Sequence, residues 1–101
     1  MSDWNQIMAD AERLARELRQ KTVDLAEAEK AGDYFADHDY QDAPMRAYLD
    51  LLAKNPPIRS RRSQKHYQGI RDIWVGWRTS LTGKDKARAW GWAVRLAKAS
   101  I

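Results

Sequence analysis

The chain has 101 residues and a mass of 11.7 kDa, enough for one modest hydrophobic core but not for a core plus a separate catalytic lobe. It contains no cysteine, which excludes disulfides and thiolate metal sites, so five tryptophans and four tyrosines must supply much of the packing. Its net charge of +4 hides a division, because residues 1–43 carry five Lys/Arg against eleven Asp/Glu (net −6) and residues 44–101 carry thirteen against three (net +10).

This division of charge indicates two kinds of partner. A basic half of this density is typical of proteins that contact a polyanion, usually nucleic acid. An acidic half on the same chain indicates contact with basic surfaces or with other copies of the protein. The alternative interpretation is that the charges only solvate the surfaces of helices.

The chain shows no sign of a targeting or membrane segment. Its start, "MSDWNQIMADAERL", is polar and acidic, and no run approaches the ~20 apolar residues that cross a bilayer. We therefore expect a cytoplasmic protein with no membrane partner.

The first predicted element is one long helix that begins near Asp3 and ends at Gly32. Asp3 with Gln6 three residues later resembles a capping box, and apolar residues keep helical spacing from Trp4 to Leu25. Gly32 is a typical helix stop. At ~1.5 Å per residue this helix would extend on the order of 40 Å, so we expect part of it to project and meet a partner.

An acidic, aromatic connection with one helical turn is predicted for residues 33–42. A short helix follows it, because Asp42 and Pro44 are typical helix starts and the "NPP" at Asn55 is a firm stop.

Two further helices are predicted in the basic half. Ser60 or Ser63 is the expected cap of the third, which reaches about Leu81 before Thr82-Gly83 breaks it; the fourth runs from Asp85 almost to the C-terminus. No segment has the pattern of a strand. The sequence thus predicts one all-α domain over residues 1–101, a small bundle of four to five helices with a long N-terminal helix.

The third predicted helix has an apolar stripe on one face: Tyr67, Ile70, Trp74, Trp77 and Leu81. Gly69 and Gly76 fall on the opposite side, where an exposed helical glycine costs ~1 kcal/mol relative to alanine. Close approach of another backbone, from a nucleic-acid strand or a neighbouring helix, would explain them. The alternative is that these glycines have no role.

The fourth predicted helix has two apolar faces, and the second includes Ala89, Trp92 and Leu96. Either this helix lies centrally in the bundle or its second face docks on another protein. A third interpretation comes from Arg88 and Arg95, which flank Trp92: the indole stacks a nucleobase while the guanidiniums bind phosphate.

The main cationic cluster lies where a loop meets the third helix and consists of Arg59, Arg61, Arg62 and Lys65. Helix N-terminal amides favour anions, and arginine forks onto phosphate oxygens. We therefore expect this cluster to contact nucleic acid. A helix-turn-helix would need a shorter turn, so the contact should be to the backbone, with little sequence preference.

Catalysis is poorly supported by the sequence. The nearest approach to a metal site is an acidic group with one histidine: Asp33, Asp37, His38, Asp39 and Asp42. It lacks a defined ligand spacing, and the alternative is a solvated loop. His66 lies among cations with no carboxylate to orient it as a general base. We expect neither an enzyme nor a bound metal or cofactor.

One family resembles the C-terminal half. The segment "YLDLLAKNPPIRSRRSQKHYQGIRDIWVGWRTSLTGKDKARAWGWAVRLAKA" (48–99) resembles the small α-helical subunit of CRISPR effector complexes, particularly that of type III systems. The similar elements are "RSQKHYQGIR" (62–71), a basic and aromatic helix start, and "ARAWGWAVRLAKA" (87–99), an alanine-rich helix. Residues 1–43 have no counterpart in the resemblance.

The resemblance implies a non-catalytic bundle that stacks in several copies, head to tail, along the guide-bearing backbone of an effector ribonucleoprotein. Its partners would be guide RNA, the target or a displaced single strand, other effector subunits and copies of itself. The phosphate contacts would be Arg59, Arg61, Arg62 and Lys65, with Arg71, Arg78, Arg88 and Arg95 in second rank. Trp92, Leu96, Gly69 and Gly76 would contribute to subunit interfaces.

Two other classes stay open. The first is a phage or plasmid helical protein that binds and blocks a protein or nucleic-acid machine through its acidic first helix. The second is a small hydrolase or metal protein that uses the Asp/His group of residues 33–42.

Overall fold

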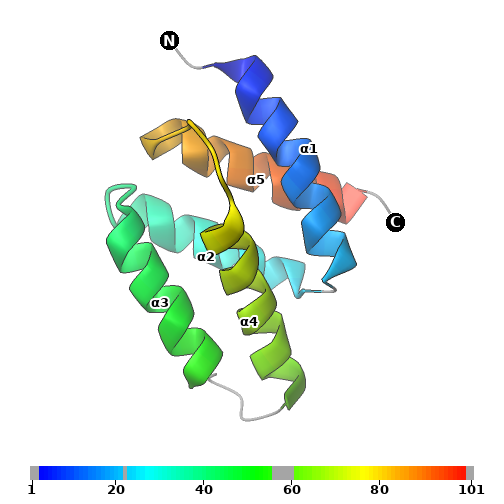
Figure 1. Ribbon diagram of the computed structural model, residues 1–101, viewed down its shortest axis with the longest axis vertical. Helices are drawn as coiled ribbons and strands as arrows, with labels where there is room; N and C mark the ends of the chain where they lie inside the picture. The colour runs from blue at the N-terminus through cyan, green and yellow to red at the C-terminus, as the bar shows by residue number, and fades with distance from the viewer. Residues whose placement is uncertain (1–2, 22, 56–60, 100–101) are drawn as a thin grey trace.

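The chain folds into five α-helices in the computed structural model, which describes residues 3–21, 23–55 and 61–99 (Figure 1). The helices are α1 (Trp4–Gln20), α2 (Leu25–Asp37), α3 (Asp42–Lys54), α4 (Arg61–Gly76) and α5 (Gly83–Ala99). The described residues contain no strand, so the predicted all-α bundle is confirmed.

The helices pack as two connected groups. α3 and α4 lie side by side and antiparallel, whereas α5 packs against both α1 and α2 (Figure 1). α2 also contacts α3, and α1 contacts α4, so the two groups share a core. The molecule measures 42 × 32 × 19 Å, so it is flattened along one axis. Of the three interpretations of the last helix, its packing agrees with a central position in the bundle.

The N-terminal helix has 17 residues, and its predicted end at Gly32 is wrong. α1 ends at Gln20, and the side chain of Asp24 starts a second helix by accepting hydrogen bonds from the N–H groups of Ala26 (2.9 Å) and Glu27 (3.3 Å). Val23, between the two helices, is buried. The chain therefore folds back on itself, and no 40 Å helix projects from the domain.

The start of α1 follows the prediction in part. The Asp3 carboxylate accepts a hydrogen bond from the Gln6 N–H at 3.1 Å, as an N-cap does. The Gln6 side chain, however, donates to Asp10 at 2.7 Å instead of returning to the cap residue. The reciprocal half of a capping box is thus replaced by a bond to a buried carboxylate.

The connection between α2 and α3 is shorter than predicted, because Asp33 to Asp37 belong to α2. Asp39 and Tyr40 have φ values of 57°, a left-handed conformation that costs roughly 1–2 kcal/mol for each residue with a side chain. The Tyr40 N–H donates to the Phe35 carbonyl at 3.0 Å, and the two rings meet edge to face at 5.8 Å. These contacts hold the tight turn and fix the direction of the Tyr40 ring.

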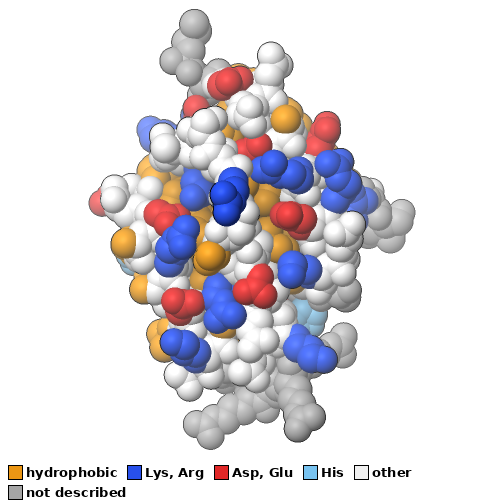
Figure 2. All heavy atoms as spheres, viewed as in Figure 1, with side chains coloured by type: hydrophobic (Ala, Val, Ile, Leu, Met, Phe, Trp, Pro, Cys, Tyr) orange, Lys and Arg blue, Asp and Glu red, His pale blue; other side chains and the backbone are white. Residues whose placement is uncertain are grey.

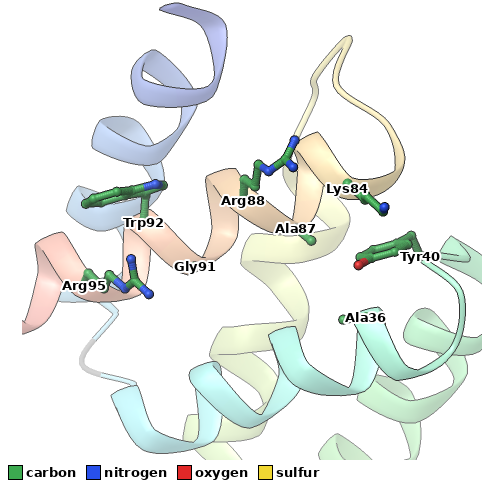
Figure 3. A pocket seen from close by; sticks show the side chains of 8 residues that line it. All are labelled: Ala36, Tyr40, Lys84, Ala87, Arg88, Gly91, Trp92 and Arg95. Atoms are coloured by element: carbon green, nitrogen blue, oxygen red, sulfur yellow. The ribbon is translucent and has the colours of Figure 1, made fainter. Parts of the chain in front are cut away.

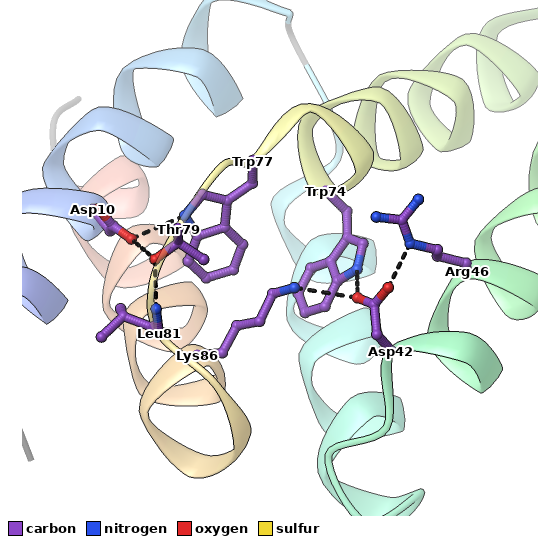
Figure 4. A network of polar contacts seen from close by, with 8 residues as sticks. All are labelled: Asp10, Asp42, Arg46, Trp74, Trp77, Thr79, Leu81 and Lys86. Atoms are coloured by element: carbon purple, nitrogen blue, oxygen red, sulfur yellow. Dashed lines mark hydrogen bonds and ion pairs between the residues drawn. The ribbon is translucent and has the colours of Figure 1, made fainter.

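Asp10 of α1 explains why α4 ends at Gly76 and not at Leu81. Its carboxylate is only 3% exposed and accepts hydrogen bonds from the Trp77 indole N–H (3.1 Å) and from the Thr79 hydroxyl (Figure 4). The Thr79 oxygen in turn accepts from the Leu81 N–H at 3.0 Å. These bonds satisfy polar groups of the segment 77–81 outside a helix, so the helix stops early.

Aromatic rings fill the centre of the bundle. Trp74 and Trp90 are fully buried and meet edge to face at 5.2 Å, with Phe35 and Trp77 packed on the Trp74 ring at 4.9 and 5.5 Å. The Trp90 N–H donates to the Ala28 carbonyl at 2.8 Å. The predicted core stripe of Tyr67, Ile70, Trp74, Trp77 and Leu81 is confirmed, because all five side chains are buried.

A second carboxylate, Asp42 at the start of α3, ties three helices together. It accepts hydrogen bonds from the Trp74 indole N–H of α4 (3.0 Å), the Lys86 ammonium of α5 (3.2 Å) and the Arg46 guanidinium (Figure 4). Lys86 also lies 4.6 Å from the Trp74 ring centre. Partial burial disfavours the charged carboxylate, but the bonds from Arg46, Lys86 and Trp74 outweigh it and lower the pKa of Asp42.

We predict that Asp10→Asn lowers the free energy of unfolding by about 1–3 kcal/mol. The amide places a donor where the carboxylate accepts bonds, so one buried donor loses its partner. Urea unfolding followed by tryptophan fluorescence measures the change. Glu12→Gln, at an exposed site on the same helix, is the matched control and should stay within ~0.5 kcal/mol of wild type. An Asp10→Asn variant as stable as wild type would contradict the role given to this carboxylate.

The lowered pKa of Asp42 predicts a defined acid dependence. A folded-state pKa below the unfolded value means that the unfolded chain binds more protons, so the contribution of Asp42 is complete at neutral pH and is lost as pH falls below about 4. Urea unfolding between pH 7 and 3 should show a shallower decline for Asp42→Asn than for wild type. The neighbouring control Gln41→Ala should keep the wild-type slope, and equal slopes for all three proteins would contradict the assignment.

Candidate nucleic-acid interface

Most of the main cationic cluster lies outside what the structure describes. Arg59 is among the residues not described, and Arg61 and Arg62 are placed in the first turn of α4 without a description of their side chains. Lys65 is described, and it is exposed on α4. The predicted role of this cluster in nucleic-acid contact stays a prediction.

Two second-rank arginines lie in different surroundings. The Arg71 guanidinium is 3.8 Å from Asp50 of α3 and 3.4 Å from Asp72 of its own helix, so it helps to join α3 to α4. Arg78 is exposed in the segment after α4, where its backbone carbonyl accepts a bond from Arg13 of α1 at 3.2 Å.

Gly69 does not lie on an exposed line, so that prediction is wrong. It is buried, and a Cβ atom added to it would lie 2.7 Å from the Val23 side chain, which means that the close neighbour belongs to the same chain. Because Gly69 is buried, it does not contribute to the predicted subunit interface. Gly76 is exposed, and a Cβ there would meet nothing within 4 Å. A subunit contact at Gly76 stays a prediction.

The second apolar line of α5 is divided between the core and the surface. Ala89 is fully buried, Leu96 is half-buried against the core, and Trp92 is 36% exposed. The central position of α5 thus accounts for the burial of Ala89 and of much of the Leu96 side chain. It leaves the Trp92 indole accessible, with Arg95 lying 5.1 Å over its ring.

Four exposed cations follow one edge of α5 at helical spacing: Lys84, Arg88, Arg95 and Lys98. They are separated by four, seven and three residues, so they share one face of the helix, and Gly91 occupies the middle of that face. We call this set the α5 basic stripe. Its side chains extend over roughly 21 Å at ~1.5 Å per residue.

A hollow of about 300 Å³ lies beside the stripe, between α5 and the end of α2 (Figure 3). Lys84, Arg88 and Arg95 supply its cations, Trp92 and Tyr40 supply its aromatic rings, and Ala36, Ala87 and Gly91 are its small residues. None of the described residues that line it is acidic. We call this space the basic hollow.

A second hollow of about 240 Å³ continues from the basic hollow and shares four lining residues with it: Ala36, Ala87, Gly91 and Arg95. Its walls carry both signs of charge, with Glu29 and Asp33 from α2 facing Lys98. The Glu29 carboxylate is bonded to the Lys98 ammonium, and this bond together with the charges of Lys98 and Arg95 lowers the pKa of Glu29. The groove between α2 and α5 is therefore cationic at one end and balanced at the other.

Sequence reasoning identified Arg88, Trp92 and Arg95 but missed Lys84, Lys98 and Tyr40. The signal for the two lysines was available, because each lies on the same helical face as the arginines. The signal for Tyr40 was not available, since its position depends on the left-handed turn after α2.

The Asp/His group of residues 33–42 does not gather into a metal site. No group of three or more His, Asp or Glu within the described ranges lies close enough to hold a metal ion. The His38 Nδ1 atom is 2.9 Å from the Tyr34 carbonyl, and Asp42 is bonded to Trp74, Lys86 and Arg46.

No helix in the described part of the chain is long and apolar enough to cross a membrane.

Comparison of the chain with known protein families, with curated proteins and with solved structures finds no match. The side chains of the groove, their exposure and their charge are therefore the features that indicate a function.

The two helical glycines of this groove should respond to alanine in opposite directions. A Cβ at Gly91 would meet nothing within 4 Å, so Gly91→Ala should raise the free energy of unfolding by about 1 kcal/mol through helix propensity. A Cβ at Gly32 would lie 2.9 Å from the buried Trp90 ring, so Gly32→Ala should lower it by about 1–3 kcal/mol despite the same gain in propensity. Urea unfolding of both variants checks this, and stabilisation by Gly32→Ala would contradict the packing described for Trp90.

Proposed function

We propose that this protein is a non-catalytic helical module that binds nucleic acid through the α5 basic stripe. The observation that carries the proposal is the basic hollow, which is lined by Lys84, Arg88 and Arg95 and by no described acidic residue, although Arg88 is also paired with Asp85 at 2.8 Å. Cations that line a hollow whose described walls carry no acid create a positive potential that attracts phosphate. Lysine and arginine contacts of this kind supply most of non-specific nucleic-acid binding.

The distribution of charge in the folded chain supports this choice of surface. Ion pairs join the acidic and basic halves of the sequence, as in Lys86 with Asp42 and Lys98 with Glu29. Figure 2 shows basic and acidic side chains interspersed on the face that it draws. Part of the basic excess is therefore balanced within the molecule, and the basic hollow stands out because its described walls lack acids.

Binding should depend little on nucleic-acid sequence. The stripe presents flexible lysine and arginine side chains, which position a backbone but carry no sequence information when they contact phosphate. The loop cluster of Arg59, Arg61, Arg62 and Lys65 would be a separate phosphate contact, and Arg78 a further one. Arg71 would contribute less, because it is already paired with two aspartates.

In its specific form, the proposal places the protein as the small subunit of a CRISPR effector ribonucleoprotein of the type III kind. The support is the resemblance of residues 48–99, a segment that contains the whole of the α5 basic stripe. Copies would stack along the guide-bearing backbone, with guide RNA and its target, or a displaced strand, as ligands. Catalysis would belong to other subunits.

The test is fluorescence anisotropy of labelled, mixed-sequence RNA and DNA strands, titrated at several salt concentrations. Lys84→Ala/Arg95→Ala should weaken binding to all sequences and reduce the log-log salt slope by roughly 0.7–0.9 for each lost contact. The matched control is Arg16→Ala/Lys54→Ala, which removes the same charge from exposed sites on α1 and α3 and should change binding less.

Separate titration of Arg59→Ala/Arg61→Ala/Arg62→Ala divides the contact between the two basic surfaces. If Lys84→Ala/Arg95→Ala binds as tightly as wild type and the triple variant does not bind, the nucleic-acid contact belongs to the loop cluster and not to the stripe. No binding by wild type at low salt would overturn the proposed function.

A further inference from the structure

Two of the five tryptophans remain at the surface. Trp74, Trp77 and Trp90 are buried in the core, whereas Trp4 at the start of α1 is 50% exposed and Trp92 on α5 is 36% exposed. Tryptophan supplies the largest apolar surface of any side chain, so two accessible indoles on a small domain indicate a surface that meets a ligand.

Both exposed indoles are in contact with arginines of the α5 basic stripe. The Arg88 guanidinium lies 5.8 Å from the Trp4 ring centre, and the Arg95 guanidinium lies 5.1 Å from that of Trp92. Arg88 and Trp92 are four residues apart on α5 and therefore neighbours on its surface. Trp4, Arg88, Trp92 and Arg95 thus form a row in which indoles and guanidiniums alternate, which we call the indole row.

The indole row adjoins the cations proposed to hold phosphate. Arg88, Trp92 and Arg95 all line the basic hollow, and Lys84 completes its charge (Figure 3). A flat indole beside a backbone-binding cation is the arrangement with which proteins hold single strands, because every base offers a π-face. The charge of the row also matches a polyanion and would repel a basic protein surface.

We infer that the indole row stacks unpaired bases on Trp4 and Trp92, so that the ligand is single-stranded nucleic acid and not duplex. This inference rests on the proposed function and adds base stacking to it. A guanidinium over an exposed ring is held weakly, and stacking of a base on the same ring is stronger. An incoming base therefore displaces Arg95 from Trp92, and the released guanidinium binds the adjacent phosphate.

Duplex cannot use this surface in the same way. Its bases are stacked on one another, so an indole on a helix surface reaches only the backbone and the groove edges. Arg88 keeps its pairing with Asp85 at 2.8 Å, which holds its guanidinium beside Trp4. The preference for unpaired bases thus comes from the two rings, while the stripe supplies attraction to any phosphate chain.

The experiment compares three ligands of equal phosphate number: a mixed-sequence single strand, a blunt duplex of half its length and an abasic strand. Each is titrated by anisotropy with wild type, Trp4→Leu/Trp92→Leu, and the matched control Leu51→Ala/Val75→Ala, which removes exposed apolar side chains from α3 and α4. Wild type should prefer the intact single strand, and the double Trp variant should lose about fivefold or more of that affinity for each ring. Affinity for the abasic strand should stay unchanged in that variant.

Two further readouts separate a stacking role from a structural one. Circular dichroism and urea unfolding establish that the Leu variants are folded, and Trp92→Tyr, which keeps a ring, should retain most of the single-strand preference. Fluorescence of the exposed indoles should be quenched by the intact strand and not by the abasic one.

Failure of the inference is distinct from failure of the proposed function. Equal affinity of wild type for intact and abasic strands, with binding still lost in Lys84→Ala/Arg95→Ala, would overturn base stacking and leave backbone binding in place. No binding to any of the three ligands would overturn both. Self-association of wild type in sedimentation, abolished in the double Trp variant, would show that the indoles form a protein interface and would also overturn the inference.

Discussion

A buried carboxylate needs donors around it, and Asp10 meets this requirement by drawing α1 and the segment 77–81 together. Its donors come from Gln6 of its own helix and from Trp77 and Thr79 in the connection between α4 and α5. A carboxyl group with so little exposure is tolerated only when such bonds satisfy it. The path of the chain from α4 into α5 is therefore fixed by one side chain near the N-terminus.

The position of the groove depends on that path. Once Asp10 holds the segment 77–81, α5 starts beside α3, where Lys86 reaches Asp42 and lies over the Trp74 ring. Trp90, one turn further along α5, is then locked into the core by its bond to Ala28 of α2. Because these contacts fix the rotation of α5, its opposite edge, with the basic stripe, is left at the surface beside α2.

Residues at the helix ends predicted those helix boundaries that depend on neighbouring residues alone. The proline at position 44 and the capping carboxylate of Asp3 are visible in the sequence, and α3, the start of α1 and α5 follow them closely. The break after Gln20 was also marked, by Asp24 with Glu27 three residues later, but a continuous apolar period concealed it. The end of α4 could not be found in this way, because its cause, Asp10, lies 67 positions from Trp77. The same holds for the site: Arg88, Trp92 and Arg95 share one helix, whereas Trp4 and Tyr40 reach it only through the fold.

The folded charge distribution changes what the sequence division means. An acidic first half and a basic second half indicated a molecule with two charged ends, yet α2 packs along α5 and the two halves pair through Glu29 and Lys98. Such exposed pairs add little stability, but they cancel the positive electrostatic potential at one end of the groove. Positive potential remains where Ala36 is the described α2 residue beside Lys84, Arg88 and Arg95. The site proposed for a phosphate chain is thus decided less by how many cations the chain carries than by which part of the α5 basic stripe faces Ala36 instead of the acids of α2.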